Sequence, residues 1–143
     1  MRTIRAISAA AFAALLGVGC GTALRAPRAG SALLSSVQAT TGSDSVRFLL
    51  QVTNTSEQPV VLDLDTDPGF FFTVERTGMP LWNSAADRTV TPAARADTIA
   101  PGDTRSFQAS WKPPLGLRGD LAVTAVLRDR HHPISRSARF RLP

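Results

Sequence analysis

Residues 46–54 read VRFLLQVTN, and this stretch decides the fold. Every second position carries an apolar side chain, namely Val46, Phe48, Leu50 and Val52. Successive side chains of a β-strand point to opposite faces, so this period of two predicts a strand with one face in a core. An amphipathic helix would instead repeat its apolar residues every three to four positions, and no segment of the chain gives that pattern convincingly.

The same alternation recurs along the rest of the chain. It is found at 60–65, 106–111, 121–127 and 134–142, and two further strands are expected at 33–40 and 70–76. Turn-forming residues separate these segments: Asn54–Ser56, Asp67–Gly69, Thr77–Gly78, Pro101–Gly102, Gly116–Gly119 and Pro133. About seven short strands in roughly 110 residues predict an all-β fold, an antiparallel β-sandwich of immunoglobulin-like architecture.

Four aromatic residues are expected to fill most of the core of this sandwich: Phe48, Phe72, Phe107 and Trp111. Burial of each side chain stabilises the fold by about 2–3 kcal/mol. The longest stretch without a firm strand pattern is 83–98, so we expect a loop there. That loop is either functional or a plain surface crossover between sheets.

The first 20 residues, MRTIRAISAAAFAALLGVGC, have the organisation of an export signal. Arg2 and Arg5 form a basic head, and the apolar run that follows is shorter than the roughly 20 residues that span a membrane. Leu16 and Gly19, placed before Cys20, resemble a bacterial lipobox, in which a peptidase cuts in front of a cysteine that carries lipid. The resemblance implies that residues 1–19 are a lipoprotein signal peptide. An ordinary secretory signal cut nearby is the alternative.

Lipidation of Cys20 would have clear consequences, because the chain has no other cysteine. No thiol would remain for a disulfide, a nucleophile or a metal site. The protein would be exported and held on a bacterial membrane by its acyl chains. Gly21, in place of an aspartate, favours an outer membrane facing the periplasm where the organism has two membranes. Residues 20–31 then read as a flexible tether, and residues 32–143 as the folded domain.

The charge of the chain excludes one class of partner. Lysine and arginine number 16 against 11 aspartates and glutamates, a net charge of +5. Without Arg2 and Arg5 the counts are 14 and 11, a net charge of +3. The basic residues form no stripe with interleaved aromatic residues, so we expect no nucleic-acid partner.

Four segments follow one another in an order that resembles the BsuPI-type proteinase-inhibitor domain: LQVTNTSEQPVVLDL, FFFTVERTGMPLWNSA, TIAPGDTRSFQASW and GDLAVTAVL. The matching positions are Asn54, Phe72, Val74, Gly78, Leu81, Trp82, Ala100–Gly102, Trp111 and the strand that carries Val123, Ala125 and Leu127. The resemblance spans about residues 46 to 128. It implies an immunoglobulin-like sandwich, and the family takes its name from a bacterial inhibitor of an intracellular serine protease.

A sandwich that inhibits a protease would present a rigid loop in extended form to the protease cleft. One candidate is the 83–98 segment, with Arg88 and Arg95 as specificity residues. The other is the segment KPPLGLRG at 112–119, in which Lys112 is followed by Pro113 and Pro114. Prolines stiffen a loop and so lower the entropy that is lost on binding. The alternative for both segments is an ordinary solvated turn.

Several residue clusters suggest chemistry but fail the spacing tests. The segment DLDTDPG at 63–69 resembles a calcium loop, yet Pro68 and Val74 stand where an EF-hand needs glycine and glutamate, so a solvated strand end is favoured over weak calcium binding. Asp129, His131 and Ser135 are triad residue types, but no nucleophile elbow or oxyanion loop accompanies them. We therefore expect no cofactor, no metal and no enzymatic activity. The remaining cluster, Asn54–Ser56, is formally a glycosylation sequon.

Together these patterns predict a lipid-anchored sandwich that binds a protein partner in the cell envelope, with serine-proteinase inhibition as its specific form. The alternative is a structural or accessory envelope lipoprotein that inhibits nothing. Such a protein would bind through a sheet face or edge, for example the arginine-bearing last strand at 136–141.

Overall fold

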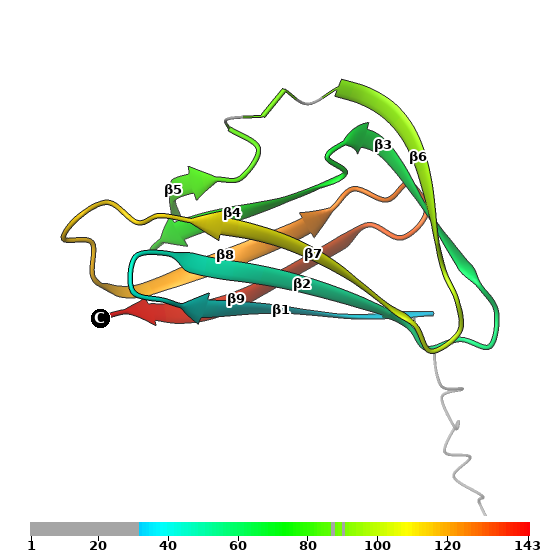
Figure 1. The fold of residues 1–143 in the computed structure, drawn as a ribbon, viewed down its shortest axis with the longest axis horizontal. Helices are drawn as coiled ribbons and strands as arrows, with labels where there is room; N and C mark the ends of the chain where they lie inside the picture. Colours follow the sequence, from blue (N-terminus) through cyan, green and yellow to red (C-terminus); the bar gives the residue numbers. More distant parts are fainter. Residues whose placement is uncertain (1–31, 87, 90) are drawn as a thin grey trace, which may run out of the picture. The chain divides into compact units, whose positions relative to one another are not determined.

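A computed structural model of the chain describes residues 32–143, apart from 87 and 90 (Figure 1). In this part of the chain all regular structure is β, and no helix is present that is long and apolar enough to cross a membrane. The nine strands are β1 (Leu33–Thr41), β2 (Val46–Asn54), β3 (Val60–Asp67), β4 (Phe70–Arg76), β5 (Met79–Asn83), β6 (Thr91–Ile99), β7 (Thr104–Trp111), β8 (Gly119–Leu127) and β9 (Ile134–Leu142). The predicted signal peptide, lipidated Cys20 and tether fall outside the described residues.

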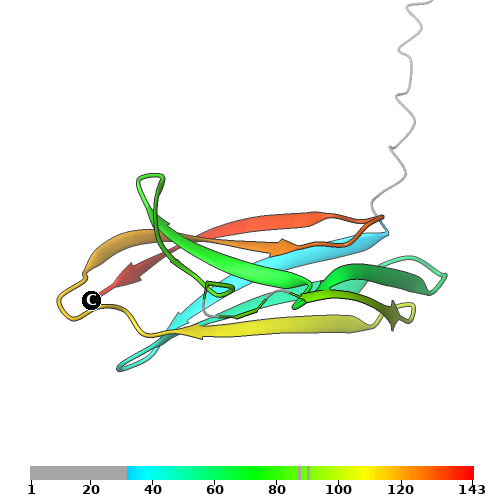
Figure 2. The same ribbon diagram turned by 90° about the horizontal axis from the view of Figure 1, so that it is seen from above.

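The strands form three antiparallel sheets. Their orders are β1-β2-β7, β5-β4-β8-β9 and the two-stranded β3-β6. The first two sheets lie face to face, as Figures 1 and 2 show, and Phe48 of β2 stacks on Phe72 of β4 with 5.9 Å between ring centroids. Along one side the two sheets meet where Arg136 Nε of β9 donates a hydrogen bond to the carbonyl of Ser35 in β1, at 3.2 Å. The fold is the predicted immunoglobulin-like β-sandwich.

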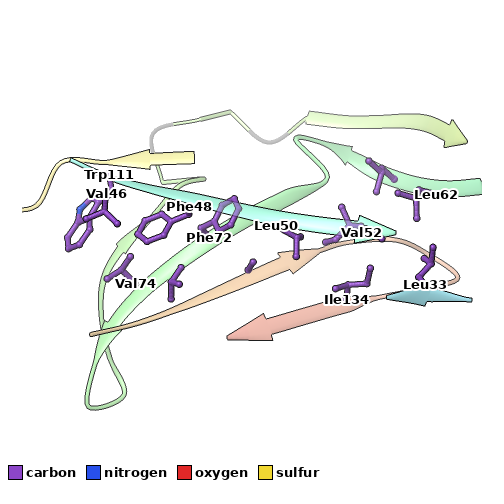
Figure 3. Close-up of a cluster of buried hydrophobic side chains, with 14 of the residues drawn as sticks. Leu33, Val46, Phe48, Leu50, Val52, Leu62, Phe72, Val74, Trp111 and Ile134 are labelled. Carbon is purple, nitrogen blue, oxygen red and sulfur yellow. The ribbon is translucent and has the colours of Figure 1, made fainter. Parts of the chain in front are cut away.

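The core lies between the two facing sheets and follows the predicted alternation (Figure 3). The apolar residues at every second position of β2, from Val46 to Val52, are fully buried, and those of β8 from Leu121 to Leu127 are buried as well. Phe48 is surrounded by the rings of Phe72, Trp82 and Phe140, with centroids 5.6 to 5.9 Å apart. Of the four predicted core aromatics, Phe107 is only half-buried and packs at the edge against Phe70, 5.1 Å away.

The strand count of about seven is too low, because β5 and β6 were not expected. The prediction of a loop over 83–98 is wrong for residues 91–98, which belong to β6 and pair with β3 from Val60↔Ile99 to Asp67↔Thr91. The sequence of β6, TPAARADTI, contains three alanines and a proline and has no apolar alternation. Alanine and proline have a low preference for strands, so β6 forms because it pairs with β3. The strand β5 is not predicted from the sequence because it contains Pro80, and a proline within a segment argues against a strand there.

The sandwich has two distinct ends. Leu33 pairs with Asn54, whereas Val46, at the other end of β2, pairs with Trp111. We call the end where β1 begins the proximal end, and it also carries the connections 55–59, 100–103 and 128–133 (Figures 1 and 2). The opposite, distal end carries the 42–45 turn, the 112–118 loop and Pro143.

Asn54 stabilises the proximal end from a fully buried position. Its side-chain Nδ2 donates to the carbonyls of Gln58 and Ile99, at 2.7 and 2.9 Å. Its Oδ1 accepts hydrogen bonds from the backbone N–H and the hydroxyl of Ser56. The side-chain nitrogen that a glycan would modify is therefore buried, and it already donates two hydrogen bonds in the folded domain.

Candidate protein-binding loop

The 112–118 loop leaves the sandwich from a rigid base. Trp111, the last residue of β7, is buried and stacks on Trp82 of β5 with 6.1 Å between ring centroids. Lys112, Pro113 and Pro114 follow directly, and the prolines restrict the backbone as the chain turns away from the sheet. The loop therefore begins at a residue fixed by core packing.

The tip of the loop is a tight turn. The backbone N–H of Leu117 donates to the carbonyl of Pro114 at 3.1 Å, and Gly116 has a positive φ of 80°. A turn of type II requires such a φ at its third position, which explains the glycine. Leu115 lies at the second position and is 104% exposed relative to a free residue. The predicted extended loop is thus a hydrogen-bonded turn that projects one leucine.

The loop is also fastened where it returns to the sandwich. Leu117 is partly buried and packs against the core. The guanidinium of Arg76, at the end of β4, donates a hydrogen bond to the backbone carbonyl of Arg118. Contacts on both sides therefore hold the turn in place.

A hollow of about 280 Å³ lies beside the loop at the distal end. Residues of the 41–46 turn and the C-terminal Leu142 and Pro143 form the rest of its lining. Lys112, Pro113 and Pro114, the loop residues proposed from sequence, all line this hollow, together with the charged side chains of Asp44 and Arg118. Three segments far apart in the chain thus meet around the base of Leu115.

The other two candidate residues lie elsewhere. Arg88 is exposed in the connection between β5 and β6, where its N–H donates to the carbonyl of Ala85 at 3.2 Å. Arg95 is exposed on β6, opposite Leu64, and lines a separate hollow of about 290 Å³ between the β3-β6 sheet and β7. The structure therefore does not bring Arg88 or Arg95 to the hollow beside the 112–118 loop.

The sequence predicts this loop, but three of its structural features are not predicted: the exposed Leu115, the contact from Arg76 and the neighbouring 42–45 turn. Leu115 is not among the residues predicted from sequence in this loop, which are Lys112, Pro113 and Pro114, although its place between proline and glycine indicates a turn. Arg76 and the 42–45 turn were missed because their contacts with the loop depend on the fold.

In the acidic segment 63–69, two carboxylates form ion pairs with an arginine. Arg130 Nη1 lies 3.3 Å from Asp63 Oδ2, and Nη2 of the same guanidinium pairs with Asp65. The hydrogen bond to Asp65, and after it the charges of Asp63 and Asp65, raise the pKa of Arg130 above its ordinary value. Across 32–143, residues 87 and 90 aside, no three His, Cys, Asp or Glu side chains gather as metal ligands.

Asp129 closes the turn between β8 and β9. Its buried carboxylate accepts hydrogen bonds from the backbone N–H groups of Asp63, His131 and His132, and lies 3.1 Å from Nδ1 of His132. The ring of His131, the residue considered for a triad, instead has its Nε2 4.0 Å from Asp63. The carboxylate thus has a structural role, since it satisfies backbone donors of two neighbouring segments.

Two facing antiparallel sheets that enclose one apolar core define the class of immunoglobulin-like β-sandwich domains. Within that class the family is given by the sequence match. The chain belongs to the BsuPI family, described as intracellular proteinase inhibitor, whose family model matches residues 33–132. The match confirms the resemblance noted from the sequence. No curated protein matches the chain significantly.

Solved structures with partial similarity come from varied proteins. A β-glucosidase from Erythrobacter marinus has 14% identity and a TM-score of 0.42, over 78% of this chain and 15% of the glucosidase. A sporulation control protein from Bacillus subtilis has 13% identity and a TM-score of 0.42, over 78% of this chain and 48% of its own. A CARDB domain from Pyrococcus furiosus has 13% identity and a TM-score of 0.42, over 77% of this chain and 93% of the CARDB chain. The chain thus spans less than half of the first two.

Proposed function

We propose that this protein is a non-enzymatic inhibitor that binds a serine proteinase through its 112–118 loop while lipid on Cys20 holds it at a bacterial membrane. The observation that carries the proposal is a fastened loop with a fully exposed leucine, in a domain of a proteinase-inhibitor family. An enzyme of the cell envelope is the proposed target.

The state of the loop before binding supports this proposal. An inhibitor gains affinity when its contact loop is already ordered, because each side chain and backbone segment that must be immobilised weakens binding. Here the Pro114–Leu117 hydrogen bond, the contact from Arg76 and the stacking of Trp111 order the loop in the free protein.

The position of the loop also suits an anchored protein. The chain that carries Cys20 joins the domain at Ala32, next to the first residue of β1 at the proximal end. The 112–118 loop lies at the distal end, beyond the full length of β2 and β7. A proteinase that approaches the loop would therefore not meet the point where the tether begins.

The alternative function uses a strand in place of a loop. β9 is an edge strand, and Arg136, Arg139 and Arg141 are exposed along it. An accessory envelope lipoprotein would bind an acidic partner there. The inhibitor is favoured because Arg136 already donates a hydrogen bond to Ser35, and β1 lies beside β9 at that point.

The decisive experiment is a titration of the full-length protein, in detergent, against a serine proteinase of the subtilisin type, with residual activity as the readout. Stoichiometric loss of activity, with the protein intact on a gel, is the expected result. Full activity at a large excess of the protein would overturn inhibition and favour the accessory role.

The anchor needs its own test. The full-length chain and a Cys20→Ser variant would be expressed in a bacterium fed with labelled fatty acid. We expect label and membrane association for the wild type and neither for the variant. Equal labelling of the two chains, or no label in either, would exclude lipid at Cys20.

A further inference from the structure

We infer that Leu115 is the side chain that enters the primary specificity pocket of the target, so the target is a proteinase that cleaves after large apolar residues. This inference rests on the proposed inhibitory function and specifies its partner. It replaces the arginines and lysine that the sequence suggested as specificity residues.

The exposure of Leu115 differs in kind from that of the other exposed apolar side chains. In the described part of the chain the other large ones are Leu34, Val61, Met79 and Leu81, exposed by 64%, 49%, 67% and 41%. All four lie on strands, where the backbone is held flat within a sheet. Only Leu115 stands on a loop that projects from the end of the sandwich, and only such a residue can reach into a deep pocket.

The charged residues of the loop are less well placed. Lys112 follows directly on Trp111, and Arg118 directly precedes β8, so both lie at the base of the loop. Leu115 lies three residues from each of them, at the tip. A pocket that selects lysine or arginine would therefore meet a leucine first.

The turn also explains how the loop would bind without being cleaved as a substrate. A peptide substrate lies extended on both sides of the bond that is attacked. Here the Leu117–Pro114 hydrogen bond and the positive φ of Gly116 reverse the chain immediately after Leu115. The Leu115–Gly116 bond is thereby carried away from the path that an extended substrate follows. We expect Leu115 to fill the pocket while this bond stays intact.

The test uses two enzymes and four forms of the full-length protein. The enzymes are a subtilisin-type proteinase, with an apolar pocket, and trypsin, with an acidic one. The proteins are the wild type, Leu115→Ala, Leu115→Arg and the control Leu34→Arg. Leu34 is an exposed residue of β1 near the proximal end, far from the 112–118 loop. Thermal unfolding of each form verifies that it is folded.

We expect the wild type and Leu34→Arg to inhibit the subtilisin-type enzyme equally. Leu115→Ala should raise the inhibition constant by about 30-fold or more, the loss typical of a central contact residue. Leu115→Arg should lose inhibition of the subtilisin-type enzyme and gain inhibition of trypsin. Mass spectrometry of the wild-type complex should show no cleavage between Leu115 and Gly116.

The outcomes separate this inference from the function on which it rests. Inhibition of neither enzyme by the wild type would overturn the proposed function and the inference together. Inhibition that is unchanged in both Leu115 variants would leave the function standing and overturn the role of Leu115. Wild-type inhibition of trypsin alone would overturn the apolar specificity, and rapid cleavage at Leu115–Gly116 would overturn the non-substrate mode of binding.

Discussion

Arg76 at the end of β4 and Arg118 at the end of the 112–118 loop are joined by a hydrogen bond from the guanidinium of the first to the backbone carbonyl of the second. The two residues are 42 positions apart in the chain. The bond ties the loop to the four-stranded sheet, whereas the loop begins from the facing three-stranded sheet. Both layers of the sandwich therefore hold the loop.

The first prediction concerns this bond. Arg76→Ala should weaken inhibition about fivefold, because the binding free energy loses roughly 1 kcal/mol when the loop must be ordered on binding. Inhibition constants for the subtilisin-type enzyme measure the effect. Arg47→Ala, which removes an exposed arginine from β2, is the matched control and should bind as the wild type does. Equal constants for the two variants would show that the bond does not order the loop.

Asn54→Ala should destabilise the domain strongly. The substitution removes the amide that donates to the carbonyls of Gln58 and Ile99 and the oxygen that accepts from the N–H of Ser56. The side chain that makes these hydrogen bonds is fully buried. Buried groups left without partners cost about 1–3 kcal/mol each, so a loss of roughly 3 kcal/mol in the free energy of unfolding is expected. Urea unfolding measures it. Thr53→Ala removes an exposed hydroxyl pair with Thr104 and should cost less than about 1 kcal/mol.

Asp129→Ala should cost about 3 kcal/mol in the free energy of unfolding, because three backbone N–H groups lose the carboxylate that accepts their hydrogen bonds. Asp65→Ala is the control. Its carboxylate pairs with Arg130 at the surface, and such exposed pairs contribute at most about 1 kcal/mol. Similar losses in both variants, measured by urea unfolding, would contradict the structural role of Asp129.

Gly69→Ala tests a close approach between two segments. A Cβ atom at Gly69 would lie 2.8 Å from Cβ and 2.9 Å from Cδ1 of Leu64, closer than carbon atoms pack. Relief of this overlap requires a backbone shift, which typically costs about 1–3 kcal/mol. Differential scanning calorimetry should show a lower unfolding temperature. An unchanged unfolding temperature would mean that β3 moves aside without cost.

The sandwich was predictable because the apolar alternation of its central strands can be read within each strand's own sequence. In β2 and β8 every second position carries an apolar residue, and the residues at these positions are buried. β6 was not predictable, because Ala93, Ala94 and Ala96 show no alternation and the strand exists through its partner, β3. Local pattern therefore identifies strands with a continuous apolar face, and it misses a strand such as β6, in which Ile99 at the end is the one buried residue.

The candidate site divides in the same way. The position of the 112–118 loop was predictable from its prolines and glycine, which are local signals. The contact from Arg76 was not, because it joins residues that only the fold brings together. Arg88 and Arg95 are predicted as specificity residues because 83–98 is expected to be a loop, whereas Arg95 lies on β6. The exposure of Leu115 follows from its place on the turn, which the neighbouring proline and glycine indicate.

The place of Pro143 has a practical consequence for anyone who handles this protein. Pro143 lines the hollow beside the 112–118 loop, at the distal end of the sandwich. An affinity tag or fluorescent fusion appended to Pro143 would emerge next to Leu115 and compete with a partner for the same space. Under the proposed function, such a fusion would weaken the capture of a partner in a pull-down. A tag placed before Ala32 emerges at the proximal end and leaves the loop clear.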